Sequence, residues 1–260
     1  MNRYAKYKTV IFGLCIIIIL QGLLLIRFWP KKKIMPTVYI KGKIAIVIDD
    51  WGYNLNNLHF LDEIKYPLNI SVLPNLTFST QVAQKVKQKG MELILHLPLE
   101  PESNKYVGLE QNTITTDMAA KQIREILLKD ISHFPYIKGV SNHMGSKATR
   151  SAKTMRIIFQ ELEKKRLYFL DSLVSTDSVC QELAAEMELK FGKRDVFLDN
   201  EENTQYIKGQ IEELMMQAKR EGYAIGIGHD RTITLKVLKE VMPQLEKGGF
   251  KFVFVSELVK

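Results

Sequence analysis

The sequence predicts an α/β fold in which parallel strands form a closed or nearly closed barrel with helices outside it. From residue 44 onward, short apolar runs alternate with segments of helical periodicity, and this alternation is typical of a mostly parallel sheet covered by helices. Seven or eight such units follow one another in about 215 residues with no Gly/Ser-rich linker, which favours one barrel over two domains. A doubly wound open sheet stays an alternative, because it has the same periodicity.

A transmembrane helix is predicted to precede the barrel. Residues 10–26 form a run of 17 residues without a charge, and a helix of this length is about 26 Å long, just enough for the hydrocarbon core of a bilayer. The run leads into Arg27, Phe28 and Trp29 and then into three lysines, with no small-residue cleavage site. An uncleaved signal anchor is therefore favoured over a cleaved signal peptide.

The predicted parts of the chain are an anchor with basic flanks at 1–33, a linker at 34–43 and a catalytic domain at 44–260. The formal net charge of +8 belongs to the N-terminal part, because residues 1–40 hold seven of the 37 basic residues and none of the 29 acidic ones. A protein that binds nucleic-acid phosphates would carry this excess on its folded domain. The charge distribution therefore argues against a nucleic-acid partner.

Two further classes of protein are excluded by motif and composition. The sequence has no G-x-G-x-x-G after the first predicted strand and no G-x-x-x-x-G-K-[ST], so nucleotide binding is unsupported. It has two cysteines, Cys15 and Cys180, which is too few for a disulfide scaffold or a multi-cysteine zinc module.

The strands and helices of the domain follow from local patterns. Short continuous apolar runs predict buried parallel strands, and apolar residues at helical spacing, ended by Gly90, Gly222 or Gly248, predict helices. Thr115 or Thr116 is the expected N-cap of one helix. The predicted strands lie at 44–48, 68–73, 91–95, 137–140, 167–170, 196–198, 223–227 and 250–255. The predicted helices lie at 55–64, 76–89, 117–133, 151–165, 178–187, 204–221 and 232–247.

Asp or His residues follow five of the predicted strands. In a parallel barrel the chemistry lies at the carboxyl ends of the strands, so we expect these side chains to converge on one site. Taken alone, each has a simpler explanation as a turn, cap or packed residue; His59, His133 and Cys180, which lie in helical patterns, are expected to be such residues. The residues at the strand ends are Asp49, Asp50, His96, His143, Asp171 and His229, with Glu100 four residues after His96.

This set of residue types points to metal-assisted hydrolysis of an ester or amide. Two adjacent aspartates repel each other unless a cation or a proton separates their roles, and one metal ligand with one base is a solution to that repulsion. Histidine and carboxylate ligands suit zinc or another first-row metal. The metal would acidify a water molecule and polarise a carbonyl, and a histidine across the site would protonate the leaving group.

Five segments in this order resemble the motifs of the divergent branch of the polysaccharide deacetylase family. They are IAIVIDD at 44–50, GMELILHLPLEP at 90–101, GVSNHMGS at 139–146, LDS at 170–172 and IGIGH at 225–229. The resemblance covers about 43–260. It implies a distorted (β/α) barrel of about seven parallel strands and a metal-dependent deacetylase, most simply a zinc enzyme, acting on N- or O-acetylated polysaccharide or a peptidoglycan-like glycan.

The resemblance also implies roles for the candidate residues. Asp49 is the expected base, Asp50 and His96 are expected ligands, and His229 is the expected acid, with Asp171 completing the catalytic set. The family's second motif ends on a histidine or serine ligand, where this chain has Glu100, so Glu100 or His143 is expected to take that place. The family's third motif supplies an arginine, which GVSNHMGS lacks.

Two other functions fit the same residues. One is a catalytically weak barrel that retains the metal as structure and binds a wall glycan or an envelope protein. The other is a metal-free glycosidase with Asp49 and Glu100 as its carboxylate pair. For the deacetylase, the substrate predicts a single-pass protein of the cell membrane with its domain on the extracytoplasmic side.

Overall fold

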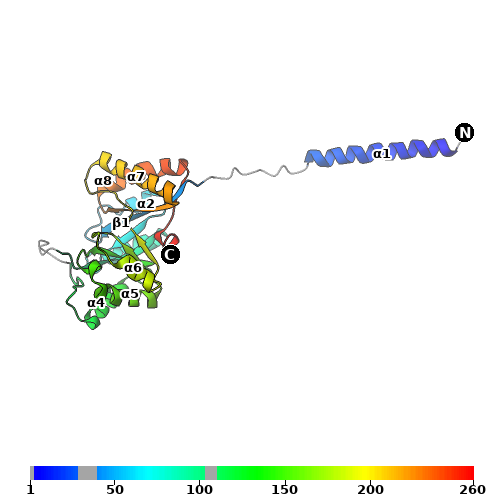
Figure 1. The fold of residues 1–260 in the computed structure, drawn as a ribbon. Coiled ribbons are helices and arrows are strands. Elements are labelled where there is room, and N and C mark those ends of the chain that lie inside the picture. Colours follow the sequence, from blue (N-terminus) through cyan, green and yellow to red (C-terminus); the bar gives the residue numbers. More distant parts are fainter. Residues whose placement is uncertain (1–2, 29–39, 103–109) are drawn as a thin grey trace. The chain divides into compact units, whose positions relative to one another are not determined.

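The computed structural model describes residues 3–28, 40–102 and 110–260. The chain divides into two units, Met1–Val38 and Tyr39–Lys260, and helix α1 (Arg3–Phe28) belongs to the first (Figure 1). Within the described residues, no helix has both the length and the apolar character needed to cross a membrane. The transmembrane helix predicted for this segment is therefore not supported. Of the predicted linker at 34–43, only 40–43 are described.

The second unit is built on one parallel sheet. In the described part of the chain, nine strands join this sheet, and every ladder between them is parallel. The strands are β1 (Gly42–Trp51), β2 (Asn69–Val72), β3 (Glu92–Leu99), β4 (Gly139–Met144), β5 (Tyr168–Asp171), β6 (Phe191–Lys193), β7 (Val196–Phe197), β8 (Tyr223–His229) and β9 (Phe250–Phe252).

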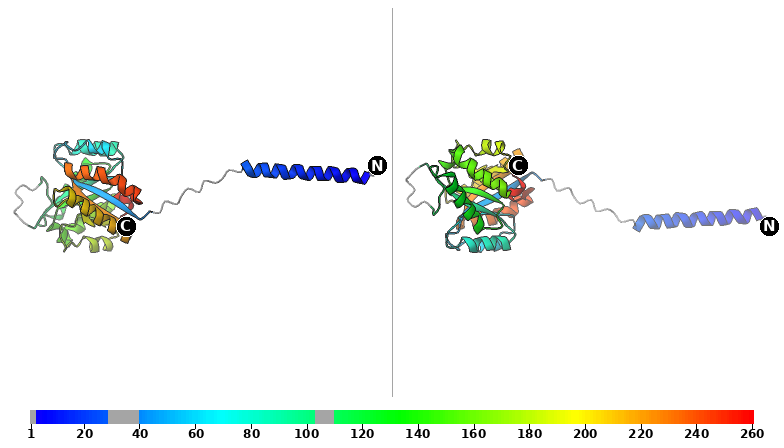
Figure 2. Two further views of the ribbon diagram at one scale, coloured as in Figure 1. Left: turned by 90° about the horizontal axis from the view of Figure 1, so that it is seen from above. Right: turned by 90° about the horizontal axis from the view of Figure 1, so that it is seen from below.

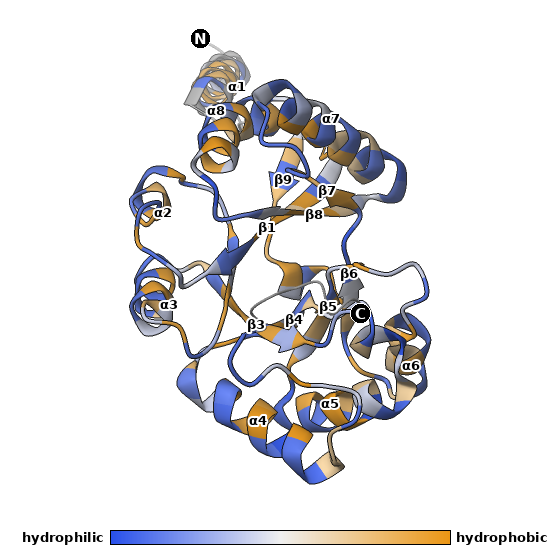
Figure 3. Cartoon of the chain, turned by 90° about the vertical axis from the view of Figure 1, so that its left-hand side faces the viewer, coloured by the Kyte–Doolittle hydropathy of each residue, from blue (hydrophilic) through white to orange (hydrophobic). Residues whose placement is uncertain are grey.

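The helices of this unit lie outside the strands (Figure 3), and Figure 2 shows the same arrangement from above and below. α4 packs beside α5, and α7 beside α8. The helices are α2 (Phe60–Glu63), α3 (Ser79–Gln88), α4 (Ala120–His133), α5 (Ala152–Lys165), α6 (Cys180–Glu186), α7 (Thr204–Glu221) and α8 (Thr232–Lys247). Two 3₁₀ turns lie at Ala148–Arg150 and Val255–Glu257.

The sheet curves into a barrel that stays partly open. Its strand order is β6-β5-β4-β3-β2-β1-β8-β7, with β9 beside the start of β1. β6 and β7 form the two ends of this order, yet only Arg194 and Asp195 separate them in the chain. This backbone segment pairs with β5 through β6 and with β8 through β7, and among the described strands no ladder joins β6 to β7. The predicted parallel (β/α) barrel is confirmed in this partly open form.

The two faces of the strands have different environments. Ala45 and Val47 of β1 belong to a core cluster made of strand residues and the C-terminal segment, whereas Ile44, Ile46 and Ile48 pack in the larger cluster that includes the helices. Side chains alternate between the two faces of a strand. In β1, β3, β4, β5 and β8 the position of a residue therefore decides whether it points into the barrel or towards the helices.

The helix predicted at 55–64 is shorter than expected, because asparagine side chains hold its first half in turns. Asn54 accepts a hydrogen bond from the backbone of Asn56, and Asn57 bonds across to Asp230 and Thr232. α2 covers only Phe60–Glu63.

Neither predicted threonine caps α4. Thr115 donates to Asp117, and Thr116 donates to Glu100. The first turn is closed instead by the side chain of Gln122, which accepts from the backbone of Ala119. The helix therefore begins at Ala120, three residues after the predicted start.

Candidate metal and catalytic site

A cavity of about 250 Å³ lies at the carboxyl ends of the strands. Asp49 and Asp50 reach it from β1, His96 from β3, His143 from β4 and His229 from β8. The register explains how they meet, because Asp49 is paired with His229 across β1 and β8, and Pro98 with His143 across β3 and β4. Five of the predicted site residues therefore line one cavity.

The two aspartates reach this cavity through different backbone geometry. Asp49 continues the alternation of Ala45 and Val47, so its side chain points into the barrel, where it is 3% exposed. Asp50 would point towards the helices in a regular strand. Its backbone instead takes a left-handed conformation with φ 65°, which is uncommon for a residue other than glycine. The turn begins at Asp50 and continues through Gly52, with φ 124°.

Asp50 lies at the centre of a cluster with two histidines. Its Oδ1 is 3.0 Å from Nδ1 of His143 and 3.2 Å from Nε2 of His96. One ligand atom from each of the three residues lies within 4.8 Å of the others. Although burial raises the pKa of Asp50, its hydrogen bonds with His143 and His96 hold it well below the usual range. Asp50 is therefore a carboxylate at neutral pH and faces two ring nitrogens.

Asp49 is more deeply buried and less fully bonded. Burial raises its pKa, and the charges of His96 and His229 offset part of that rise. Its Oδ2 lies 3.8 Å from Nε2 of His96. Among the described residues, nothing forms a hydrogen bond with its Oδ1. Burying a carboxylate oxygen without a hydrogen-bond partner costs free energy. The lone pairs of this atom are therefore available to a donor on a bound molecule.

His229 is held from behind by Asp199, which lies just after β7. Nδ1 of His229 is 2.9 Å from Oδ1 of Asp199, and Nε2 lies 3.9 Å from Oδ2 of Asp50 on the cavity side. Burial lowers the pKa of His229, but the hydrogen bond to Asp199 and the charge of that carboxylate outweigh burial and raise it. The ring thus presents Nε2 to the cavity.

Glu100 is not part of the Asp50–His96–His143 cluster. It lies one residue beyond β3, where its carboxylate accepts from Nζ of Lys147 at 2.6 Å and from the backbone and hydroxyl of Thr116, each at 2.6 Å. These contacts lower its pKa although burial raises it. His143 fills the third corner of the cluster.

Asp171 lies outside the residues that line the cavity. It follows Leu170, whose side chain points into the barrel, so its own points the other way. The carboxylate accepts from the hydroxyl of Ser178 at 2.6 Å and from the backbone of Leu173 at 2.8 Å. Burial raises the pKa of Asp171. Its contacts hold the loop after β5, and a catalytic role for it stays a prediction.

Several polar residues around the site were not anticipated from the sequence. Asp199 had the same signal as the others, a carboxylate after an apolar run, but the run Val196–Phe197 is only two residues long as a strand. Arg194 lies where β6 leads into β7, donates to the carbonyls of Ser172 and Leu173, and contributes its charge to Asp171 and Asp49. Ser71 and Ser141 lie beneath His96 inside the barrel.

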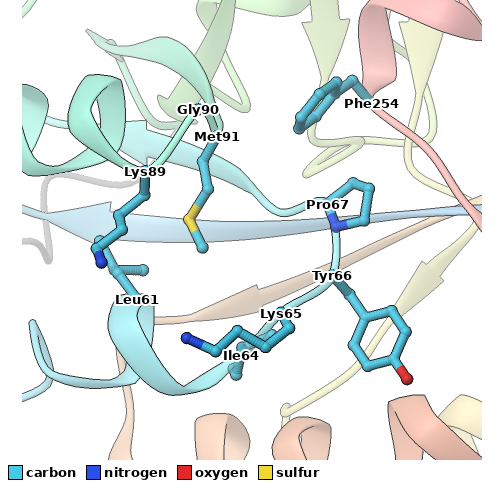
Figure 4. Close-up of a pocket in the computed structure, with 9 residues that line it drawn as sticks. All are labelled: Leu61, Ile64, Lys65, Tyr66, Pro67, Lys89, Gly90, Met91 and Phe254. Carbon is cyan, nitrogen blue, oxygen red and sulfur yellow. The ribbon is translucent and has the colours of Figure 1, made fainter.

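A larger cavity, of about 380 Å³, lies at the amino ends of β2 and β3. Figure 4 shows Tyr66, Pro67, Met91 and Phe254 among its lining residues. Its described lining contains lysines but no histidine or carboxylate. Of these two cavities, only the smaller one is therefore lined by histidine and carboxylate side chains.

Comparison with known proteins identifies the family to which these features correspond. The model of the family described as divergent polysaccharide deacetylase matches residues 46–259. The chain is also 35% identical over 206 residues to the uncharacterized protein YibQ of Escherichia coli (strain K12), covering 79% of this chain and 64% of YibQ. The chain thus spans less than two thirds of that relative. The resemblance read from the sequence motifs is confirmed.

Two solved structures show the same fold. The uncharacterized protein ATU2773 from Agrobacterium tumefaciens C58 superposes with a TM-score of 0.79 at 22% identity, covering 84% of this chain and 89% of that one. A family 4 carbohydrate esterase from Streptomyces lividans, solved in complex with acetate, superposes with a TM-score of 0.52 at 12% identity, covering 83% and 94%. At these identities the two structures support the fold alone.

Proposed function

The chain belongs to the divergent polysaccharide deacetylase family, and from this premise we propose that it is a metal-dependent hydrolase that removes acetyl groups from an acetylated glycan of the cell envelope. The observation that carries the proposal is the convergence of Asp50, His96 and His143 beside a second, partly unbonded carboxylate, Asp49. A protein that shares the fold is described as a carbohydrate esterase and was solved in complex with acetate, which motivates the choice of substrates for the test.

The side chains of this cluster suit a divalent ion, for which zinc is our proposal. One carboxylate and two imidazoles form a ligand set typical of zinc and other first-row metals, and such a set leaves positions open for water and substrate. The spacing of the three ligand atoms, all within 4.8 Å of one another, fits one shared ion. When bound, the ion would polarise the scissile carbonyl and acidify the attacking water.

Asp49 is the proposed general base. Its Oδ1 is buried and has no hydrogen-bond partner within the described ranges, so a lone pair is free to accept a proton from the water that attacks the acetyl carbonyl. A base must lie within hydrogen-bond reach of the proton that it takes, and Asp49 lines the same cavity as Asp50.

His229 is the proposed general acid. Nδ1 donates its proton to Asp199, which leaves Nε2 facing the cavity, 3.9 Å from Oδ2 of Asp50. Asp199 raises the pKa of His229 and so favours the protonated ring, and we assign to Nε2 the proton that goes to the leaving amine or alcohol of the sugar. Base and acid therefore come from paired positions on two neighbouring strands, β1 and β8.

The proposal is tested by acetate release. The purified full chain is loaded with zinc and incubated with N-acetylglucosamine oligomers, with O-acetylated glycan and with peptidoglycan fragments. We expect acetate from at least one of these substrates, loss of release on chelation, and loss of turnover in Asp49→Asn. Binding of an oligomer without any acetate release by the zinc-loaded chain would instead favour the glycan-binding barrel.

The place of action is part of the same proposal. Acetylated glycans of the envelope lie outside the cytoplasm, so the domain should lie on the extracytoplasmic side of the cell membrane. A reporter enzyme fused after Lys260 and active only outside the cytoplasm would agree with this location. Activity of such a fusion only in the cytoplasm would contradict it.

A further inference from the structure

A pair of buried serines lies directly behind the proposed metal ligand His96. Oγ of Ser141 is 2.7 Å from Nδ1 of His96 and 2.6 Å from Oγ of Ser71. The three residues come from neighbouring strands, with Ser71 on β2, His96 on β3 and Ser141 on β4, and His96 is paired with Ser141 in the register. Both serines are 0% exposed and His96 is 2% exposed.

The direction of these hydrogen bonds depends on the state of His96. Each hydroxyl has one proton to donate. When Nε2 of His96 binds a cation, the ring proton lies on Nδ1 and is donated to Ser141. Ser141 then donates its own proton to Ser71. In the opposite state, with the proton on Nε2, Nδ1 accepts from Ser141, and Ser141 accepts from Ser71.

We propose that Ser141 and Ser71 are positioning residues that fix the Nδ1–H tautomer of His96 and hold its Nε2 as a metal ligand. A histidine ligand commonly donates its other ring N–H to such a partner, and loss of the partner weakens metal binding by about 10–100-fold. The inference rests on the proposed metal site, but not on the substrate or on the reaction.

The test is the zinc affinity of the full chain, measured by competition with a chromophoric chelator and without substrate. Ser141→Ala should weaken zinc binding about 10–100-fold, because Nδ1 of His96 loses the hydroxyl to which it is bonded. Ser71→Ala should weaken binding less, because Ser141 still accepts from Nδ1. Ser141→Thr, which keeps a hydroxyl at this position, should keep most of the wild-type zinc affinity.

A matched control is a buried threonine hydroxyl outside the cavity. Thr154 on α5 is 0% exposed, and its Oγ1 lies 3.0 Å from Oγ of Ser151. Thr154 is not among the residues that line the cavity, so Thr154→Val should leave zinc affinity unchanged. Circular dichroism and the melting temperature of the metal-free proteins confirm that each variant is folded, so that a loss of affinity is not a loss of fold.

Two outcomes separate this inference from the proposed function. Zinc affinity of Ser141→Ala equal to that of the wild type, or an equal loss in Thr154→Val, would overturn the positioning role even if the enzyme releases acetate. A wild-type chain that binds zinc and shows the expected order of affinities, but releases no acetate, would support the positioning role and contradict the deacetylase.

Discussion

Asp199 holds His229 by two bonds at once. Its Oδ1 lies 2.9 Å from Nδ1 of the ring, and its Oδ2 accepts the backbone N–H of the same residue at 2.8 Å. The hydroxyl of Thr234 donates to Oδ2 as well, at 2.6 Å. With three donors on one carboxylate that is 0% exposed, the orientation of the imidazole is fixed before any substrate binds.

Replacing this carboxylate should therefore cost turnover rather than metal binding. In Asp199→Asn a neutral amide replaces the carboxylate, and it has one oxygen in place of two to accept the three hydrogen bonds. The pKa of His229, which the charge of Asp199 raises, should therefore fall. We expect kcat to drop by about 10²–10⁴-fold, the range typical for a general acid or base, while zinc affinity stays close to that of the wild type. Steady-state acetate release and a zinc titration check the two expectations. A large loss of zinc would mean that Asp199 supports the ligands instead.

Glu100 provides a test of the ligand set. Because its carboxylate bonds to Lys147 and Thr116, Glu100→Gln should bind zinc with unchanged affinity. The ion pair with Lys147 is partly exposed, so its loss should cost no more than about 1 kcal/mol of unfolding free energy. A titration with zinc and a urea denaturation curve measure both quantities. If zinc affinity collapses in this variant, Glu100 moves into the site when the metal binds.

Gly145 should resist substitution because it follows the turn after His143. Its φ is 92°, and a Cβ atom placed there would lie 2.8 Å from Cβ of Leu99. We expect Gly145→Ala to lose about 1–3 kcal/mol of unfolding free energy. Gly209→Ala in α7 is the matched control, since a Cβ there has nothing within 4 Å; it should gain about 0.5–1 kcal/mol from helix propensity. Similar urea curves for the two variants would contradict this interpretation.

The buried carboxyl group of Asp130, which lies on α4 and does not line the cavity, should make the unfolding free energy depend on pH. It is 0% exposed on α4, with one carboxylate oxygen bonded to Asn75 and the other without a partner among the described residues. Burial raises its pKa in the folded protein. The folded state therefore holds this proton more tightly than the unfolded state, so stability falls as the pH rises from the unfolded pKa through the folded one.

The variant Asp130→Asn removes that titration. Its unfolding free energy should decline less than that of the wild type between about pH 4, near the unfolded pKa of aspartate, and neutral pH. Urea denaturation of both proteins across this range gives the difference directly. A difference between the two proteins that stays constant with pH would show that the pKa of Asp130 is not raised.

Much of the site was predictable because it follows from strand alternation. Asp49, His96 and His229 each continue the set of residues that faces the barrel interior. His143 lies two residues after Ser141, which bonds to His96 inside the barrel. Each of the four lies at or near the end of an apolar run. Because Leu170 faces the barrel interior, the same rule predicts that the side chain of Asp171, the next residue, points away from the cavity. Asp50 is the exception, because its left-handed backbone cannot be read from the strand pattern.

The parts that could not be predicted depend on contacts between distant segments. Asp199 and His229 are 30 residues apart, and no local pattern pairs them. Ser71 and Ser141 look like ordinary strand residues in the sequence and gain a role only when β2, β3 and β4 lie side by side. The start of α2 was missed for the same reason, since Asn57 is bonded to residues more than 170 positions away.

The zinc content of Asp49→Asn and Asp50→Asn tests the division of roles between the two aspartates most directly. Asp50 lies within reach of two imidazoles, whereas Asp49 keeps an unbonded oxygen, and an amide is a far poorer ligand for a divalent ion than a carboxylate. We predict that Asp49→Asn retains zinc at the wild-type stoichiometry and that Asp50→Asn loses it. Equal loss of zinc in both variants, or full retention in both, would contradict the assignment of Asp50 as ligand and Asp49 as base.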